Sequence, residues 1–255
     1  MRATPSTLRQ ASLAAACLLA FAGEAAAQTQ PMSKEFPAGQ VGLVEVQTEL
    51  GPVRVVGTDS KTVKVDVLDA DPVKCRLTME LRARTLFLKA ERPKKWLFDS
   101  ARCPSGFRVQ IPKAAPLDAA TGAGSVEIAQ TGGKTSVKTG SGNVRLVGVS
   151  GDLSARLGNG SIEGETDSKA LDVSVGSGRI RLSWTKPPKR GRCDVKTGSG
   201  DIALVFPEGS KLSVQALSAA GKTVNDFPDP ARRAFLVSAV SGSGDISVRK
   251  PGPQP

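Results

Sequence analysis

The chain has 255 residues, with 35 Lys and Arg against 24 Asp and Glu, and it contains neither His nor Tyr. Without His there is no Ser-His or Cys-His catalytic pair and no His ligand for a metal ion. Aromatic residues make up only 4% of the chain, so rings on which bases or sugars could stack are scarce. The composition therefore predicts no cofactor and no metal site.

The first 27 residues have the pattern of a secretory signal peptide. Arg2 and Arg9 precede an apolar stretch, and the small residues Ala25, Ala26 and Ala27 end it before Gln28. An alternative is lipoprotein processing at Cys17, but most of the apolar residues lie beyond that position. We expect cleavage after Ala27, and an exported product in the periplasm, at the cell surface or outside the cell. No other segment reaches the ~20 apolar residues of a membrane span.

Residues 28–115 are expected to form an N-terminal β cap, with strands near Val44, Val63, Leu77 and Leu86. Cys75 and Cys103 are predicted to form a disulfide, because oxidising compartments favour disulfides. The segment between them is expected to be a basic, irregular excursion. Cys193 is left over and is expected to be a buried, inert thiol.

Two basic clusters stand out in a mature chain whose net charge would be +10 after the loss of two Arg and one Glu. The simplest interpretation is solvated surface. The alternative is attraction to anionic polymers, and the candidate anion-binding residues are then Arg92, Lys94, Lys95, Lys189, Arg190 and Arg192. An exported protein rarely meets nucleic acid. Anionic envelope polymers or a protein are therefore the expected partners.

Residues 116–249 contain an internal repeat marked by Gly-x-Gly pairs. The segments in one frame are TGAG (121–124), TGSG (139–142), LGNG (157–160), VGSG (175–178), TGSG (197–200) and SGSG (241–244). Their second glycines are separated by 18, 18, 18, 22 and 44 residues, and the last interval holds two repeats with Gly221 as a degenerate marker. An earlier relative lies at Thr48–Gly51, followed by Val53.

Side chains alternate around each second glycine. Across six copies, the positions seven and five before it and two and four after it are apolar in 20 of 24 cases, against 4 of 24 at the intervening positions. Such alternation indicates two strands per repeat with one buried face. The Gly-x-Gly between them supplies the positive dihedral angles of a tight corner.

Two architectures fit this pattern: an antiparallel meander of hairpins, or a single-stranded β-solenoid with about 18–22 residues per coil. The outward position three after the glycine reads Glu127, Arg145, Glu163, Arg181, which would alternate in charge in a stack of parallel strands. We therefore expect an all-β solenoid with stacked coils. Val144, Ile162, Ile180 and Ile202 would form an internal ladder, which Ile246 resumes after Thr223. The Pro-rich tail, residues 250–255, would end strand pairing at the far end.

A family resemblance accompanies this pattern. Phe107-Arg108-Val109-Gln110-Ile111-Pro112, the TGSG-N/D-V/I segments and the closing GDIALVFPEGSKLSVQALSAAGK resemble the bacterial adhesin-like β-strand-repeat family, a domain of unknown function. The likeness covers roughly residues 40–249. It implies an exported, right-handed β-helix-like fold without an established catalytic site, and it carries no functional residues over to this chain.

The sequence favours a non-catalytic exported protein that binds a partner or acts as an adhesin-like or scaffolding module at the cell envelope. One alternative is a β-helix lyase or hydrolase acting on acidic polysaccharide, for which Asp172 and Asp194 are the best pair of carboxylates. Another is an accessory or sensor module that binds an envelope protein. The ligand and the oligomeric state stay open at this point.

Overall fold

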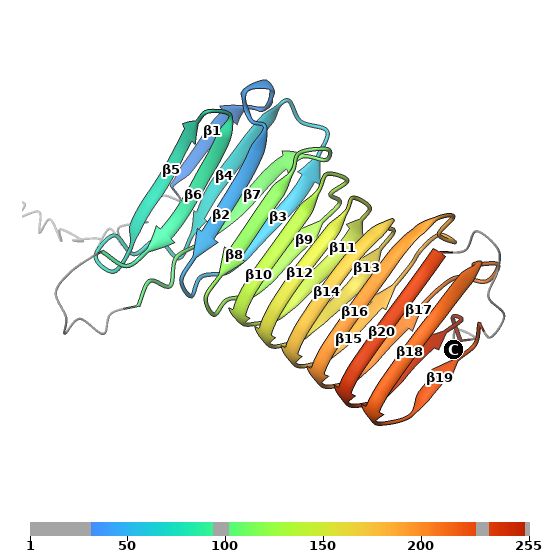
Figure 1. The fold of residues 1–255 in the computed structure, drawn as a ribbon. Helices are drawn as coiled ribbons and strands as arrows, with labels where there is room; N and C mark the ends of the chain where they lie inside the picture. Colours follow the sequence, from blue (N-terminus) through green and yellow to red (C-terminus); the bar gives the residue numbers. More distant parts are fainter. Residues whose placement is uncertain (1–31, 94–101, 228–234, 253–255) are drawn as a thin grey trace, which may run out of the picture. The chain divides into compact units, whose positions relative to one another are not determined.

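The computed structural model describes residues 32–93, 102–227 and 235–252, which form two β-sheets (Figure 1). Strands account for all the regular structure in these ranges except one turn of 3₁₀ helix, η1 (Ala38–Gln40). The predicted all-β class is confirmed. The predicted signal peptide lies outside the described residues. Within those residues, no helix is long and apolar enough to cross a lipid bilayer.

The first sheet has eleven strands. In spatial order they are β1 (Ser33–Pro37), β4 (Thr62–Leu68), β7 (Gly106–Pro112), β3 (Val53–Thr58), β9 (Val126–Ala129), β11 (Val144–Val149), β13 (Ile162–Thr166), β15 (Ile180–Ser183), β17 (Ile202–Val205), β21 (Ile246–Arg249) and β19 (Thr223–Asn225). Pairing is antiparallel between β1 and β4 and between β4 and β7, and every other pair in this sheet is parallel.

The second sheet has ten strands. In spatial order they are β18 (Leu212–Ala220), β20 (Phe235–Ser243), β16 (Gly191–Ser199), β14 (Ala170–Ser177), β12 (Leu153–Asn159), β10 (Thr135–Ser141), β8 (Leu117–Thr121), β2 (Leu43–Thr48), β6 (Thr85–Glu91) and β5 (Arg76–Arg82). Only β5 and β6 pair antiparallel. Each repeat therefore contributes one strand to each sheet, and Figure 1 shows the strands of successive repeats side by side.

The alternation of side chains explains both the strands and the core. In β14, Leu171, Val173 and Val175 are buried, whereas Asp172 and Ser174 face solvent. The inward residues of both sheets join in one hydrophobic cluster. Burying one face of each strand in this way is the main favourable contribution to the free energy of folding.

The corners between the two sheets require glycine. Gly178 has a φ of +146°, and a Cβ atom there would overlap the carbonyl oxygen of Gly160 in the repeat before it. The hydroxyl of Thr197 donates a hydrogen bond to the carbonyl oxygen of Gly178 at 3.2 Å. Gly178 thus allows successive repeats to approach closely. The hydroxyl of Thr197, from the next repeat, provides the carbonyl of Gly178 with a hydrogen-bond donor.

The predicted row of alternating charges is confirmed. Arg145 in β11 lies in register with Glu127 in β9 on one side and with Glu163 in β13 on the other. Arg181 in β15 follows Glu163. These parallel pairings exclude the antiparallel meander for this part of the chain, because residues 18 apart in sequence are direct neighbours across strands.

The predicted order of the last two repeats is wrong. Ile202 in β17 pairs directly with Ile246 in β21, and Thr223 in β19 lies beyond Ile246 at the end of the sheet. Likewise β20 lies between β16 and β18. The reason is the inward side chains: placing the repeat with Thr223 and Asn225 last keeps these polar groups at the end, while Ile246 continues the apolar column.

This order also changes the role of the C-terminal tail. The described part of the tail, residues 250–252, follows β21, which has a neighbouring strand on each side and is therefore not the last strand of its sheet. This part begins with Lys250, whose backbone N–H donates to a carboxylate oxygen of Asp226 at 3.1 Å. The end of the stack consists of β18 and β19.

At the other end, strands occur near all four predicted positions. The segment after Cys75 is not an irregular excursion, however, because β5 and β6 occupy most of residues 76–91 and pair as a hairpin. The early copy of the repeat is confirmed: Thr48 pairs with Thr121, and Val53 pairs with Val126. The repeat frame therefore begins in β2 and β3.

Candidate functional site

The outer face of the first sheet is balanced in charge. Its row of alternating charges continues to Arg54, whose guanidinium lies 3.8 Å from the carboxylate of Glu127. A shallow hollow of about 470 Å³ is lined by Arg145, Glu163 and Arg181 among other residues. Because acidic and basic side chains alternate from Arg54 to Arg181, this row offers no concentrated charge to a ligand.

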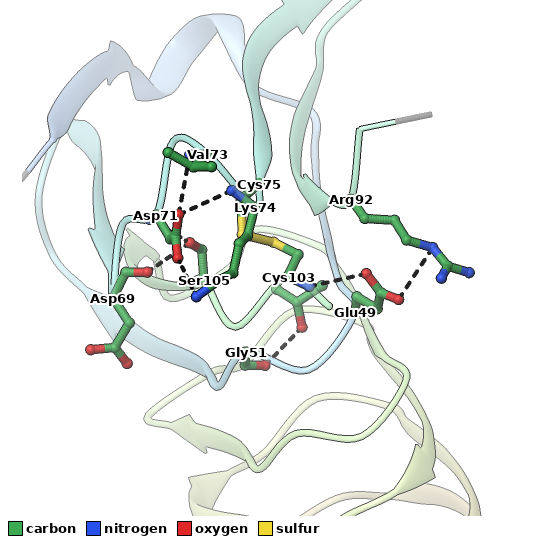
Figure 2. The surroundings of a disulfide bond; sticks show 11 residues. Glu49, Gly51, Asp69, Asp71, Val73, Lys74, Cys75, Arg92, Cys103 and Ser105 are labelled. Carbon is green, nitrogen blue, oxygen red and sulfur yellow. Dashed lines mark hydrogen bonds and ion pairs between the residues drawn. A yellow bond between two sulfur atoms is a disulfide. The ribbon is translucent and has the colours of Figure 1, made fainter. Parts of the chain in front are cut away.

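Arg92, a predicted anion-binding residue, lies beside the disulfide that joins Cys75 and Cys103, whose Cα atoms are 4.9 Å apart. Its Nε atom lies 3.6 Å from the Oε1 atom of Glu49, and the backbone N–H of Cys103 donates a hydrogen bond to the other carboxylate oxygen, Oε2, at 3.3 Å (Figure 2). Part of the positive charge of Arg92 is therefore already compensated within the protein.

The other side of the disulfide is held by Asp71. Its side chain accepts hydrogen bonds from the backbone N–H groups of Val73 and Lys74, and its carbonyl oxygen accepts one from Cys75 (Figure 2). The hydrogen bond from the Lys74 backbone lowers the pKa of Asp71 below its usual value, with help from the Lys74 ammonium. Asp71 thus orders the turn that places Cys75.

The remaining predicted anion-binding residues do not gather at one place. Lys94 and Lys95 lie outside the described residues. Lys189 and Arg190 are exposed in the connection between β15 and β16. Arg192 is exposed and is the second residue of β16. Five strands separate β16 from β6, the strand that precedes Arg92, in the second sheet. The two predicted basic clusters are therefore separate surfaces.

The predicted carboxylate pair is adjacent but compensated. Asp172 and Asp194 lie in register on neighbouring strands β14 and β16. Arg192 donates a hydrogen bond to Asp194, and this bond, with the charges of Asp194 and Asp172, raises the pKa of Arg192. Both aspartates line a hollow of about 200 Å³ together with Asp152 and Lys134. In the described ranges, no three His, Cys, Asp or Glu side chains are placed to hold a metal ion.

Cys193 is fully buried in β16 and is not part of a disulfide. Burial raises the pKa of its thiol, and the nearby Asp194 carboxylate adds to the shift. A neutral thiol in an apolar core is a poor nucleophile. Its predicted burial is confirmed.

Lys138 and Arg156 place two uncompensated positive charges side by side on the second sheet. Lys138 in β10 and Arg156 in β12 are exposed and lie directly opposite each other across the parallel strand pair. In the part of the chain that the structure describes, neither side chain forms an ion pair or a hydrogen bond. Like charges in directly opposed positions destabilise a sheet.

These two side chains belong to an outward row that we call the basic row: Gln47, Ala120, Lys138, Arg156, Ser174 and Lys196. No carboxylate interrupts it, in contrast to the alternating row of the first sheet. An open groove of about 630 Å³ runs beside the basic row. Its lining consists of Gln47, Thr48, Ala120, Thr121, Gly122, Lys138, Thr139, Gly140, Arg156, Leu157, Gly158 and Ser174.

Sequence reasoning did not identify this groove, although the signal was present. The members of the basic row from Ala120 to Lys196 all stand four residues before the second glycine of their repeats. Clusters of basic residues along the chain, such as Lys94 and Lys95, point to other surfaces. In a stack of parallel strands, residues about 18 apart become neighbours, so the relevant cluster is found by aligning the repeats.

Comparison with known proteins identifies a family. The family model described as Toastrack DUF4097 matches residues 105–249. No protein of curated function matches the chain in sequence.

Two solved structures align along most of the chain at low identity. A "putative cell adhesion protein" from Clostridium sporogenes ATCC 15579 is 12% identical, with 87% of this chain and 100% of that chain covered and a TM-score of 0.42. A "putative adhesin" from Bacteroides fragilis NCTC 9343 is 14% identical, with 88% and 98% covered and a TM-score of 0.41.

Proposed function

We propose, starting from the fact that this chain belongs to the Toastrack DUF4097 family, that it is an exported, non-catalytic module that binds a partner at the cell envelope. The family membership confirms the resemblance to a domain of unknown function that the sequence suggested. Adhesion and scaffolding are the two forms of this role that fit a stack of strands with long, regular outer faces.

One observation carries the proposal: the groove beside Lys138 and Arg156. It is open, it extends across several strands, and its two cations have no partner in the described part of the chain. The other charged surfaces are more nearly balanced by their own residues, as with Arg54 and Glu127 or Arg192 and Asp194. A site that is charged, shallow and elongated suits recognition of an extended partner.

The finer architecture belongs to the same proposal. We infer a right-handed, single-stranded β-solenoid with about 18–22 residues per coil in residues 116–249, preceded by a β cap in 28–115 and followed by the tail 250–255. The register of Val144, Ile162 and Ile180, one residue per repeat, supports this assignment.

Export after cleavage of residues 1–27 is also proposed. The disulfide between Cys75 and Cys103 supports it, because stable disulfides occur mainly in proteins of oxidising compartments. The location could be the periplasm, the cell surface or the medium.

A polysaccharide lyase or hydrolase is the second candidate, carried by Asp172 and Asp194. Three aspartates and two cations line their hollow, so an acidic substrate would meet a net negative charge there. Cleavage of acidic polysaccharide should therefore be absent in the wild type and in an Asp172→Asn, Asp194→Asn double variant. Turnover by the wild type alone would establish the enzyme instead.

Binding itself is tested with the chain from Gln28 onward, on a glycan array and in a pull-down from an envelope fraction. Specific retention of a glycan supports adhesion, and retention of one protein supports a scaffold or accessory role. A chain that binds neither would overturn the proposed function.

A further inference from the structure

We propose that the groove beside the basic row binds a linear acidic polysaccharide, which lies across the strands and parallel to the direction in which they stack. The inference rests on the proposed function and specifies its ligand. Lys138 and Arg156 would hold two anionic groups of the polymer, either carboxylates or sulfates, and Lys196 would extend the contact.

The electrostatics of the row point to an external anion. Parallel strands are about 4.8 Å apart, so the Lys138 and Arg156 side chains start from neighbouring positions at that spacing. Their other neighbours across strands are Ala120 and Ser174, which carry no charge. A bound anion would convert an unfavourable pair of like charges into two charge-assisted hydrogen bonds, and the guanidinium can engage a carboxylate or sulfate with two parallel donors.

The corner geometry builds the groove into the fold. Gly122, Gly140 and Gly158 are the first glycines of their corners, and they form part of its floor. A Cβ atom on Gly140 would lie only 2.6 Å from the carbonyl oxygen of Gly122, so the stacking itself forbids side chains here. Thr139 also lines the groove, and in the described ranges its buried hydroxyl has no hydrogen-bond partner.

The surrounding side chains indicate where the polymer lies. The outward row two residues earlier on the same strands carries Asp118, Asp172 and Asp194. Carboxylates would repel an acidic ligand, so the ligand occupies the glycine side of Lys138 and Arg156. Beyond the glycines there is an exposed line of small polar residues: Ser141, Asn159, Ser177, Ser199 and Ser243. Hydroxyl and amide groups of this kind suit the hydroxyls of a sugar.

Other anionic partners fit less well. The groove lining contains no aromatic ring, which excludes the base stacking that single-stranded nucleic acids use. Recognition of an anionic membrane by charge takes clusters of about 4–8 basic residues. The groove lining has two, and the next cations in register with it, Lys89 and Lys196, lie beyond Gln47 and beyond Ser174. The absence of aromatic rings also means that a neutral glycan would find little affinity here, so the charge of the polymer is essential.

The test uses the chain from Gln28 onward with fluorescent oligogalacturonate and heparin oligosaccharides, and with dextran as the neutral probe. The groove variant is Lys138→Gln with Arg156→Gln. The matched control is Arg145→Gln with Arg181→Gln on the first sheet, which removes the same charge from a balanced row. We expect the groove variant to bind at least one acidic probe about tenfold more weakly or worse, because loss of one good charged contact lowers affinity by about tenfold. The affinity of the control variant should stay within about twofold of the wild type.

Two further measurements separate a groove contact from misfolding and from a general charge effect. The acidic oligosaccharide should raise the thermal midpoint of the wild type and of the control, but not that of the groove variant, while all three unfold at similar midpoints without ligand. The plot of log affinity against log salt should be less steep in the groove variant, with the magnitude of its negative slope smaller by about two, one for each lost contact.

Equal weakening in both variants, or no weakening in either, would overturn the inference. The inference would also be overturned if the wild type bound neither acidic probe. In that last case, retention of a protein or another glycan in the envelope experiments leaves the proposed function intact, whereas loss of all binding removes both.

Discussion

At the residue scale, the corners depend on two separate properties of glycine: access to positive φ, and the lack of a Cβ atom. Gly178 needs both, because its φ is +146° and a Cβ atom would overlap the carbonyl of Gly160. Gly148 needs only the first. Its φ is +64°, and an added Cβ would meet no other atom within 4 Å.

Gly178→Ala should therefore destabilise the protein far more than Gly148→Ala. We expect a loss of about 3 kcal/mol or more for Gly178→Ala, from backbone strain and overpacking together. For Gly148→Ala we expect about 1 kcal/mol from the left-handed conformation alone. Urea unfolding followed by circular dichroism measures both. Equal losses would show that the close approach of the corners contributes nothing.

Much of the residue pattern could be predicted because the physics is local. Inward and outward positions follow from period-two alternation, which places Val173, five residues before Gly178, inside and Asp172 outside, as in the structure. The neighbours of Arg145 followed from the repeat length. The groove at Lys138 and Arg156 follows the same repeat length, but clusters of basic residues along the chain do not reveal it. It emerges only when the outward position four residues before each second glycine is also compared between repeats.

At the element scale, the N-terminal region combines parallel strands of the repeat type with antiparallel strands. β2 and β3 continue the two sheets, while β5 pairs with β6 in a hairpin directly after Cys75. The sequence indicated these strands but not the hairpin, because apolar residues near Leu77 and Leu86 do not specify their partners. The disulfide then ties the start of the hairpin to the residues before β7.

Reduction of this disulfide should weaken the protein considerably. The bond closes a loop over a sequence separation of 28 residues. By lowering the entropy of the unfolded chain, a disulfide across such a loop stabilises the folded state by about 3.5 kcal/mol. We expect urea unfolding of the wild type to shift to lower concentration when a reductant is added.

The Cys75→Ala, Cys103→Ala double variant provides the control. It should unfold at the lower concentration with or without reductant, because Cys193 is not part of a disulfide. An unchanged wild-type midpoint in reductant would contradict the prediction.

At the scale of the whole stack, the chain does not add its last repeats in order. β20 and β21 lie inside the stack, and β18 and β19, which precede them in sequence, lie at the end. Sequence reasoning could count these repeats but could not order them. Their order depends on which inward side chains tolerate an exposed end, and this is a property of the assembled sheets.

Deletion of residues 228–255 should therefore destabilise β18 in addition to removing β20 and β21. Without β20 and β21, β18 loses its partner over eight registered positions from Leu212 to Ala220. We expect amide exchange in residues 212–220 to accelerate on the order of a hundredfold, to the level of locally unfolded segments. Hydrogen exchange with mass spectrometry measures this.

Deletion of residues 251–255 is the control, because these residues follow the last strand. In this shorter deletion, the amide exchange rates of residues 212–220 should match those of the full chain. Continued protection of 212–220 after the longer deletion would mean that β18 can dock directly on β16, as it would in a stack built in sequence order.

The interior position of β20 and β21 has a consequence for biogenesis. A protein that emerges from its N-terminus, whether from a ribosome or through a translocon, could otherwise complete itself one layer at a time. Here β18 and β19 have no strand to pair with until β20 and β21 have been synthesised. The end of the stack can therefore reach its final pairing only after residues 235–249 have been made, and a product that stops before β20 leaves β18 and β19 without their neighbouring strands.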